Sequence, residues 1–227
     1  MCRFILAGLF ATMFDFQEDG LERDASSFST SPGPVSQVSK HVFDSSFALL
    51  LLLPLSLIAL ALLALNPLLN RGPLMHYQMR MGRAGRPFVA LKFRTMVPSA
   101  MPTRGAFDTL EEDRISQLGR LMRKLRIDEL PQVINVLRAE MSLIGPRPDL
   151  YDHARVYLQS VPGYAARYQI MPGISGYAQT EVGYVDGIEG IERKVAADLY
   201  YIAHASLRLD LWITWRTLCV VVGRKGR

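Results

Sequence analysis

One apolar run constrains this chain more than any other feature. It extends from Phe47 to Leu65, nineteen residues in which Ser56 is the one polar side chain. A run of this length predicts a membrane helix, because about 20 residues cross the hydrocarbon core of a bilayer. A buried helix of a soluble protein is the weaker alternative, since 227 residues leave too little chain to surround it. Pro54 lies inside the run, and a proline removes a helix hydrogen bond and bends the axis.

Basic residues flank the run unequally. Lys40 precedes it, whereas Arg71, Arg80, Arg83 and Arg86 follow it. The positive-inside rule places the later, denser cluster in the cytoplasm. A full crossing and a helix that kinks at its proline and leaves by the same face both fit these residues.

The formal net charge is also unevenly distributed. Residues 1–70 carry three basic and six acidic side chains, a balance of −3, so the overall +5 leaves +8 for residues 71–227. A basic domain beside an apolar segment suits phosphates, lipid headgroups or nucleic acid. Nucleic acid is disfavoured, because aromatic residues are not interleaved with the basic ones as stacking platforms. The two cysteines, Cys2 and Cys219, have no metal-ligand spacing and fit a reducing compartment.

The chain divides into three parts. Residues 1–39 form a polar leader rich in Ser, Gly and Pro, which we expect to be poorly ordered. Residues 40–70 contain the membrane helix. Residues 71–227 form the motif-dense domain, in which Gly82, Gly85 and Pro87 predict a turn before a short strand at residues 88–93.

Helical patterns follow the strand. From Arg114 onward, an apolar stripe at helical spacing predicts one helix, formed by Leu118, Leu121, Met122 and Leu125. A second helix begins near Asp128 and uses Val133, Ile134 and Leu137. Near the C-terminus, two tryptophans stand before a basic tail at residues 224–227. This pattern fits a helix at a membrane interface and a helix packed on the core equally well.

Asp128 and Glu129 are adjacent acids after a strongly basic helix. On spacing alone a structural role is favoured, with Asp128 as a helix N-cap and Glu129 at the positive end of the helix dipole. The chemical alternative uses the same physics. A carboxylate near several arginines stays ionised, so it can attack phosphorus and hold a covalent phosphoryl group. Its neighbour could hold Mg²⁺, which binds carboxylates together with substrate phosphates.

Two basic sites could clamp phosphate. Lys92 and Arg94 lie at the end of the predicted strand, and Arg147 lies between two prolines that limit its movement. An arginine held in a rigid turn suits bidentate phosphate contact. Taken singly, each of these residues is more often a solvated surface charge.

Together these motifs resemble the bacterial sugar transferase family, the monotopic phosphoglycosyl transferases that begin glycan assembly on undecaprenyl phosphate. Any one motif is weak, but their order along the chain is specific. The matching blocks are Lys40 to Asp44, Gln78 to Phe88, Lys92 to Met96, Asp128 to Gln132, Asn135 to Leu137, Met141 to Pro148, Pro172 to Gln179, Asp198 to Tyr201 and Ser206 to Leu211.

The resemblance implies a reaction and a site. Asp128 would attack the β-phosphate of a UDP-sugar and release UMP, and undecaprenyl phosphate would then take the phosphosugar from the enzyme. Glu129 would bind Mg²⁺, while Lys92, Arg123 and Arg147 match positions proposed to hold phosphate groups. The expected setting is the cytoplasmic face of the inner membrane, in the first step of exopolysaccharide, O-antigen or other glycan synthesis. Downstream glycosyltransferases are further expected partners, and a homo-oligomer is left open.

The resemblance also implies a fold. We expect a small α/β domain dominated by helices, with a membrane helix that is re-entrant and broken at Pro54, and interfacial amphipathic helices. Three departures stand out: Leu53 replaces the serine common before the proline, Ala139-Glu140 replaces Gly-Asp, and residues 180–184 replace the usual stretch after Gln179. The last segment is thought to influence the sugar nucleotide, so the donor sugar is left open.

An inactive module of the same family is the alternative hypothesis. Such a protein would bind lipid phosphate or scaffold glycan enzymes from the membrane without catalysis. The altered segment after Gln179 favours it, whereas intact Asp128, Glu129, Lys92 and Arg147 argue against it. Magnesium-dependent release of UMP distinguishes the two hypotheses.

Overall fold

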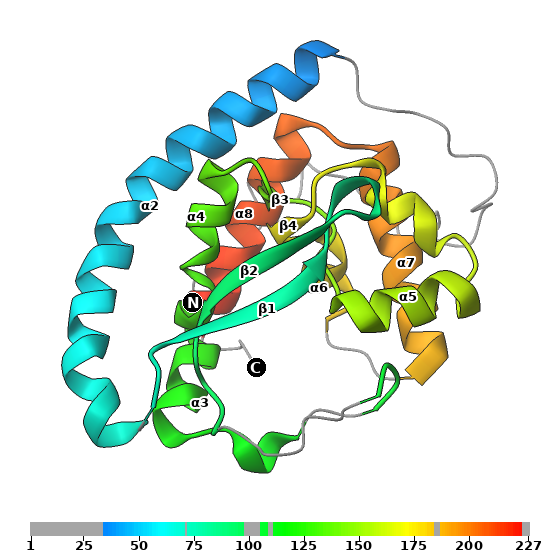
Figure 1. Ribbon diagram of the computed structural model, residues 1–227. Coiled ribbons are helices and arrows are strands. Elements are labelled where there is room, and N and C mark those ends of the chain that lie inside the picture. Colours follow the sequence, from blue (N-terminus) through cyan, green and yellow to red (C-terminus); the bar gives the residue numbers. More distant parts are fainter. Residues whose placement is uncertain (1–33, 71, 98–104, 109–110, 184–186, 224–227) are drawn as a thin grey trace.

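The computed structural model describes residues 34–70, 72–97, 105–108, 111–183 and 187–223. Most of the predicted leader, Arg71 and the basic tail at residues 224–227 lie outside the described residues. Figure 1 shows a long helix running along the outside of a compact body of shorter helices and strands.

Helix α2 (Pro34–Leu69) contains the apolar run and continues without a break across Pro54. Figure 1 shows it curving around the domain. One turn beyond Leu52, the hydroxyl of Ser56 donates to the Leu52 carbonyl at 2.7 Å, a bond of the kind that bends helices. Within the described residues, α2 is the one helix long and apolar enough to cross a membrane by length and composition. The sharp break expected at Pro54 is not seen, and re-entry into the membrane stays a prediction.

The two faces of α2 are both apolar. Ala48, Leu55 and Leu62, spaced seven residues apart, are buried against the domain. The outward face exposes more than half of each of six leucines, namely Leu49, Leu50, Leu53, Leu57, Leu60 and Leu63. A surface helix of a soluble protein presents polar residues on this side. The outward face of α2 is therefore suited to lipid.

The predicted strand and turn are confirmed. Strand β1 (Met75–Met81) pairs antiparallel with β2 (Pro87–Phe93), and η2 (Arg83–Gly85) forms the turn between them. Phe88 and Ala90 of β2 pack with helix α4 (Gln132–Leu137) beneath α2. The hairpin thus lies against the helix that follows the Asp-Glu pair.

Helix α3 (Gln117–Lys124) follows η3 (Glu112–Arg114), with Ser116 as its N-cap. The predicted apolar stripe is only partly buried. Met122 is buried in the cluster formed with α2 and β2, but Leu121 is 53% exposed. Helix α3 has eight residues and packs against its neighbours on one side, so it buries a narrower face than its apolar pattern predicts.

Short strands and helices complete the domain. The remaining helical elements are η4 (Ile127–Glu129), α5 (Tyr151–Ser160), η5 (Tyr164–Gln169), α6 (Tyr177–Glu181), α7 (Gly187–Ala203) and α8 (Leu207–Val222). Strand β3 (Ser142–Ile144) pairs parallel with β4 (Gly173–Ser175). The domain is therefore dominated by helices, as predicted, and it carries two small sheets of two strands each.

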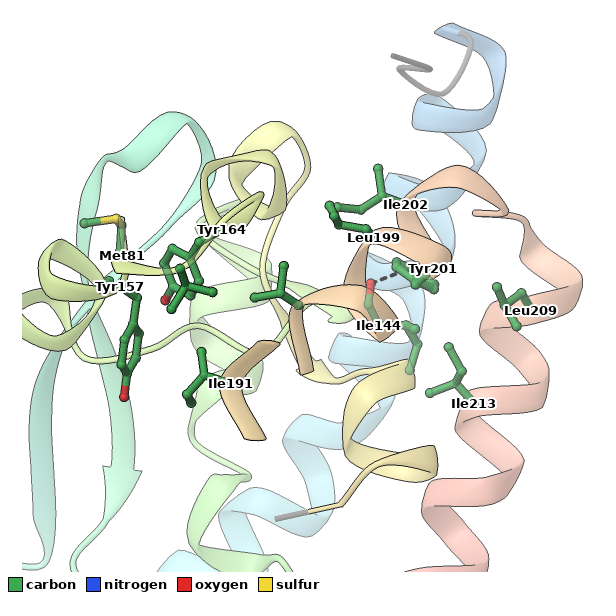
Figure 2. Packing of buried hydrophobic residues seen from close by; sticks show 13 residues of the cluster. Met81, Ile144, Tyr157, Tyr164, Ile191, Leu199, Tyr201, Ile202, Leu209 and Ile213 are labelled. Atoms are coloured by element: carbon green, nitrogen blue, oxygen red, sulfur yellow. Dashed lines mark hydrogen bonds between the residues drawn. The ribbon is translucent and has the colours of Figure 1, made fainter. Parts of the chain in front are cut away.

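The largest apolar cluster joins α7 and α8 to the rest of the domain (Figure 2). Ile213 of α8 is fully buried there, and the Tyr201 hydroxyl of α7 donates to the Ile144 carbonyl at 3.3 Å. Leu211 and Leu218, on the other side of α8, are more than half exposed. Helix α8 therefore packs on the core and keeps an exposed apolar face, so the interfacial location remains a prediction.

Asn135 fastens α4 to the hairpin. Its side-chain oxygen accepts from the Leu91 N–H at 3.0 Å, and its amide nitrogen donates to the Val89 carbonyl at 2.8 Å. The same nitrogen donates to Glu140 at 2.6 Å. Asn135 is completely buried, and its amide both accepts from and donates to the backbone of β2. This contact fixes the position of α4 relative to the end of β2.

We predict that Asn135→Ala lowers the free energy of unfolding by about 2–4 kcal/mol, because the buried Leu91 N–H and Val89 carbonyl both lose their partner. Urea unfolding of the purified protein in detergent measures the change. Asn135→Asp should destabilise the protein at least as much, because its buried carboxylate would face the Val89 carbonyl and the Glu140 carboxylate. An unchanged unfolding midpoint for Asn135→Ala would contradict this role.

Candidate active site

The Asp-Glu pair lies in a helical turn entered through an unusual backbone conformation. Arg126 has φ 53°, in the left-handed region, and a side chain other than glycine adopts this region at a cost. The backbone is helical from Ile127 onward, through Leu130 and Pro131 into α4. Asp128 lies inside this turn, so the predicted N-cap role is wrong. Arg126 occupies the cap position instead.

Glu129 is held by three cations. Arg147 makes a bidentate pair with its carboxylate, with the Nη1–Oε2 contact at 3.1 Å. Lys92 Nζ lies 3.4 Å from Oε1, and Arg126 Nη1 lies 3.5 Å from Oε2. Burial alone would raise the pKa of Glu129, but the charges of Arg147 and Lys92 outweigh it and hold the pKa well below its usual range. Glu129 is therefore an ionised, fixed carboxylate.

Asp128 has a different environment. The ion pairs at this site all go to its neighbour, and no ion pair joins Asp128 to another described residue. Burial and the adjacent charge of Glu129 raise the pKa of Asp128, and the charges of Lys92 and Arg123 only partly offset this. The expectation that nearby arginines favour the charged form is thus outweighed by desolvation. A buried carboxylate with a raised pKa and no pairing cation among the described residues is a candidate for a catalytic role.

Lys92 extends from the end of β2 toward the pair. Burial lowers the pKa of Lys92 to about 8, although the charge of Glu129 opposes the shift. The nearby charges of Arg147 and Arg80 lower it further. The ammonium group is therefore present at neutral pH and is lost just above it.

Arg147 is positioned by glycines that let two loops approach. A Cβ on Gly173 would lie 2.1 Å from the backbone nitrogen of Gly145, and one on Gly176 would lie 2.4 Å from the Gly145 carbonyl oxygen. Any larger residue at Gly173 or Gly176 would push these loops apart. The close approach places β4 beside the turn that carries Arg147, whose Nη1 also lies 3.4 Å from the Ile174 carbonyl oxygen.

A second charged network supports the same turn. The guanidinium of Arg167 donates to the Arg147 carbonyl at 2.8 Å, to Asp149 at 2.6 Å and to Asp198 at 2.7 Å. Lys194 donates to Asp149 at 2.6 Å. The sequence analysis assigned no role to these residues. Of the four supporting residues, Asp198 alone falls within a matched block.

Three other arginines have distinct roles. Arg94 donates to the main-chain carbonyls of Asn70, Pro73 and Met96, so its guanidinium braces the connection from α2 to β1. The predicted phosphate contact of Arg94 has no support in these contacts. Arg123 donates to Thr95 at 3.0 Å, and its charge acts on Asp128. Arg126, which no sequence motif marked as part of the site, pairs with Glu129.

The residues present fit Mg²⁺ only in part. Among the described residues, no group of three or more His, Cys, Asp or Glu side chains converges as a metal cage. Mg²⁺ is commonly held by one or two carboxylates together with substrate phosphates and water. The adjacent carboxylates of Asp128 and Glu129 match that pattern, with the remaining ligands coming from substrate.

Comparison with known proteins identifies the class. The family model described as bacterial sugar transferase matches residues 35–224, so the chain belongs to this family of transferases. A UDP-glucose:undecaprenyl-phosphate glucose-1-phosphate transferase of Caulobacter vibrioides is 42% identical over 193 residues, covering 82% of this chain and 72% of the relative.

Two further relatives differ in length. A UDP-N-acetylgalactosamine-undecaprenyl-phosphate N-acetylgalactosaminephosphotransferase of Aeromonas hydrophila is 36% identical over 191 residues, 84% of this chain but 45% of the relative. The chain thus spans less than half of that protein. An exopolysaccharide production protein of Sinorhizobium fredii is 34% identical over 215 residues, 85% of this chain and 89% of the relative.

The two shifted groups predict a bell-shaped dependence of turnover on pH. Activity should fall at low pH as Asp128 is protonated, at a pKa above its ordinary 3.8, and at high pH as Lys92 loses its proton near pH 8. Lys92→Arg keeps the positive charge at all these pH values, so it should move the high-pH limb upward by more than one unit. A high-pH limb that stays in place in Lys92→Arg would contradict the assignment.

Proposed function

We propose that this chain transfers a sugar 1-phosphate from a UDP-sugar to undecaprenyl phosphate and releases UMP. The observation that carries the proposal is the division of labour within the Asp-Glu pair. Glu129 is committed to Arg147, Lys92 and Arg126, which leaves the buried carboxylate of Asp128 unpaired beside a concentrated positive charge. Cations in such a position neutralise the phosphate charge that would otherwise repel an anionic nucleophile.

The proposed reaction has two displacements at one phosphorus. A carboxylate oxygen of Asp128 attacks the β-phosphorus, and the bond from that phosphorus to the bridging oxygen breaks, so UMP leaves with the electron pair. An oxygen of undecaprenyl phosphate then attacks the same phosphorus, and Asp128 departs as a carboxylate. The product is undecaprenyl diphosphate carrying the sugar. Mg²⁺, held by Glu129 and the substrate phosphates, would supply further charge neutralisation.

The packing of α2 supports a monotopic placement at the membrane. A straight helix of 36 residues measures about 54 Å, nearly twice the hydrocarbon thickness of about 30 Å. The domain packs against α2 at Ala48, Leu55 and Leu62, along most of the apolar run. A vertical crossing would draw this charged domain into the bilayer with the helix. We therefore place the outward leucines in one leaflet, with the active site at the cytoplasmic face of the inner membrane.

The names of the relatives favour an active enzyme over an inactive module. Those names include UDP-sugar donors, undecaprenyl phosphate and exopolysaccharide production. By analogy with these relatives, we propose for this chain a UDP-sugar donor, an undecaprenyl phosphate acceptor and a role in exopolysaccharide or other glycan synthesis. Downstream glycosyltransferases would consume the product.

The direct test of function is UMP release. Purified protein with Mg²⁺ and undecaprenyl phosphate should release UMP from one member of a panel that includes UDP-glucose and UDP-N-acetylgalactosamine. Asp128→Asn should lower the rate by at least about 1,000-fold, because an amide is a poor nucleophile, while leaving the protein folded and in the membrane. Turnover by Asp128→Asn at a rate comparable to that of the unmodified protein would remove Asp128 from this role.

The monotopic placement predicts the accessibility of two positions on either side of the apolar run. Val38 and Tyr77 are 66% and 64% exposed, so each can be replaced by cysteine in a protein whose Cys2 and Cys219 are serine. In inverted inner-membrane vesicles, a membrane-impermeant maleimide should label both positions without detergent. Labelling of Tyr77→Cys alone, with Val38→Cys labelled only after detergent is added, would indicate a full crossing.

A further inference from the structure

One buried amide next to the catalytic pair has no partner. Gln132 is 2% exposed, and its side-chain nitrogen forms no hydrogen bond within the part of the chain that the structure describes. Buried polar groups in proteins are nearly always satisfied, because an unpaired donor loses its bonds to water and gains nothing in return. An orphan donor beside a reactive carboxylate calls for an explanation, and a bound ligand that supplies the missing acceptor is one.

The backbone places this amide beside Asp128. Helical geometry runs from Ile127 through Leu130 and Pro131 into α4, so Gln132 lies one turn after Asp128 on the same face. Asn135 lies one turn further along that face and bonds to the backbone of β2. This face of the helix is therefore turned toward β2. Lys92, which follows Leu91 in that strand, forms an ion pair with Glu129.

Asn135 gives an internal comparison. Its oxygen and nitrogen are both satisfied by Leu91, Val89 and Glu140, as expected of an amide that holds two elements together. Gln132 belongs to the same face and is almost as deeply buried, but its side-chain nitrogen donates to no described residue. A structural explanation that accounts for Asn135 does not account for Gln132.

We propose that the side-chain N–H of Gln132 donates to a non-bridging oxygen of the phosphoryl group that Asp128 receives. The proposal rests on the function proposed above and assigns that site one further substrate-binding residue. Negative charge on these oxygens must be stabilised as the phosphoryl group is transferred, and a pre-positioned donor in a buried site does this well. A neutral amide also adds no positive charge that would pair with Asp128.

The inference predicts that stability and activity change in opposite directions. Gln132→Met is similar in length and removes the unsatisfied donor, so the midpoint of thermal unfolding should stay constant or rise. In the same protein, kcat/KM for UMP release should fall about 100- to 1,000-fold, as expected for the loss of one donor to the reacting group. Gln159→Met, at an exposed glutamine of α5, is the matched control and should change neither quantity.

Gln132→Glu provides a second test that keeps the shape and replaces the donor with an acceptor. It should reduce kcat/KM at least as much as methionine, because its carboxylate repels the phosphoryl oxygens. Either folded variant with kcat/KM within twofold of the unmodified protein would overturn the assignment of Gln132. Failure of the unmodified protein to release UMP from any donor would instead refute the proposed function, so the two failures are distinguishable.

Discussion

The bidentate pair between Arg147 and Glu129 is the contact on which the site depends. It joins the proline-flanked turn after β3 to the helical turn before α4, and Lys92 and Arg126 complete the charge balance around the carboxylate. Burying a carboxylate is costly unless it is paired, and three cations pair with Glu129. Its neighbour Asp128 is also buried and is repelled by Glu129, but it forms no ion pair with another described residue.

Much of this arrangement could be predicted from sequence, because local chemistry marks it. The turn before β2 and the strand itself follow from glycine, proline and apolar patterns. The grouping of Lys92 and Arg147 with the Asp-Glu pair is implied by the resemblance to the family, and the ion pairs to Glu129 confirm that they lie together. The rest depends on contacts between distant segments. Arg94 is indistinguishable in sequence from a phosphate ligand, and only the fold shows that the main-chain carbonyls of Asn70, Pro73 and Met96 accept from its guanidinium.

Two departures from the family pattern also become intelligible. Ala139 has φ 57°, where the usual glycine would carry no penalty and alanine costs about 1–2 kcal/mol. Glu140, in place of aspartate, accepts from Asn135 at 2.6 Å and so joins the contact that fastens α4 to β2. Ser56 follows Pro54 and bonds to the Leu52 carbonyl, so the curvature of α2 does not need a serine before the proline.

The central claim is that Asp128 becomes covalently attached to the phosphosugar, whereas Glu129 interacts only with cations and forms no covalent bond. The most direct measurement is mass spectrometry of the protein after incubation with Mg²⁺ and the UDP-sugar, with undecaprenyl phosphate left out. The account predicts a mass increase of one sugar phosphate on the peptide that contains Asp128, which disappears when the lipid is added. A protein that turns over with the lipid present but carries no adduct without it, or carries the adduct elsewhere, would contradict the account.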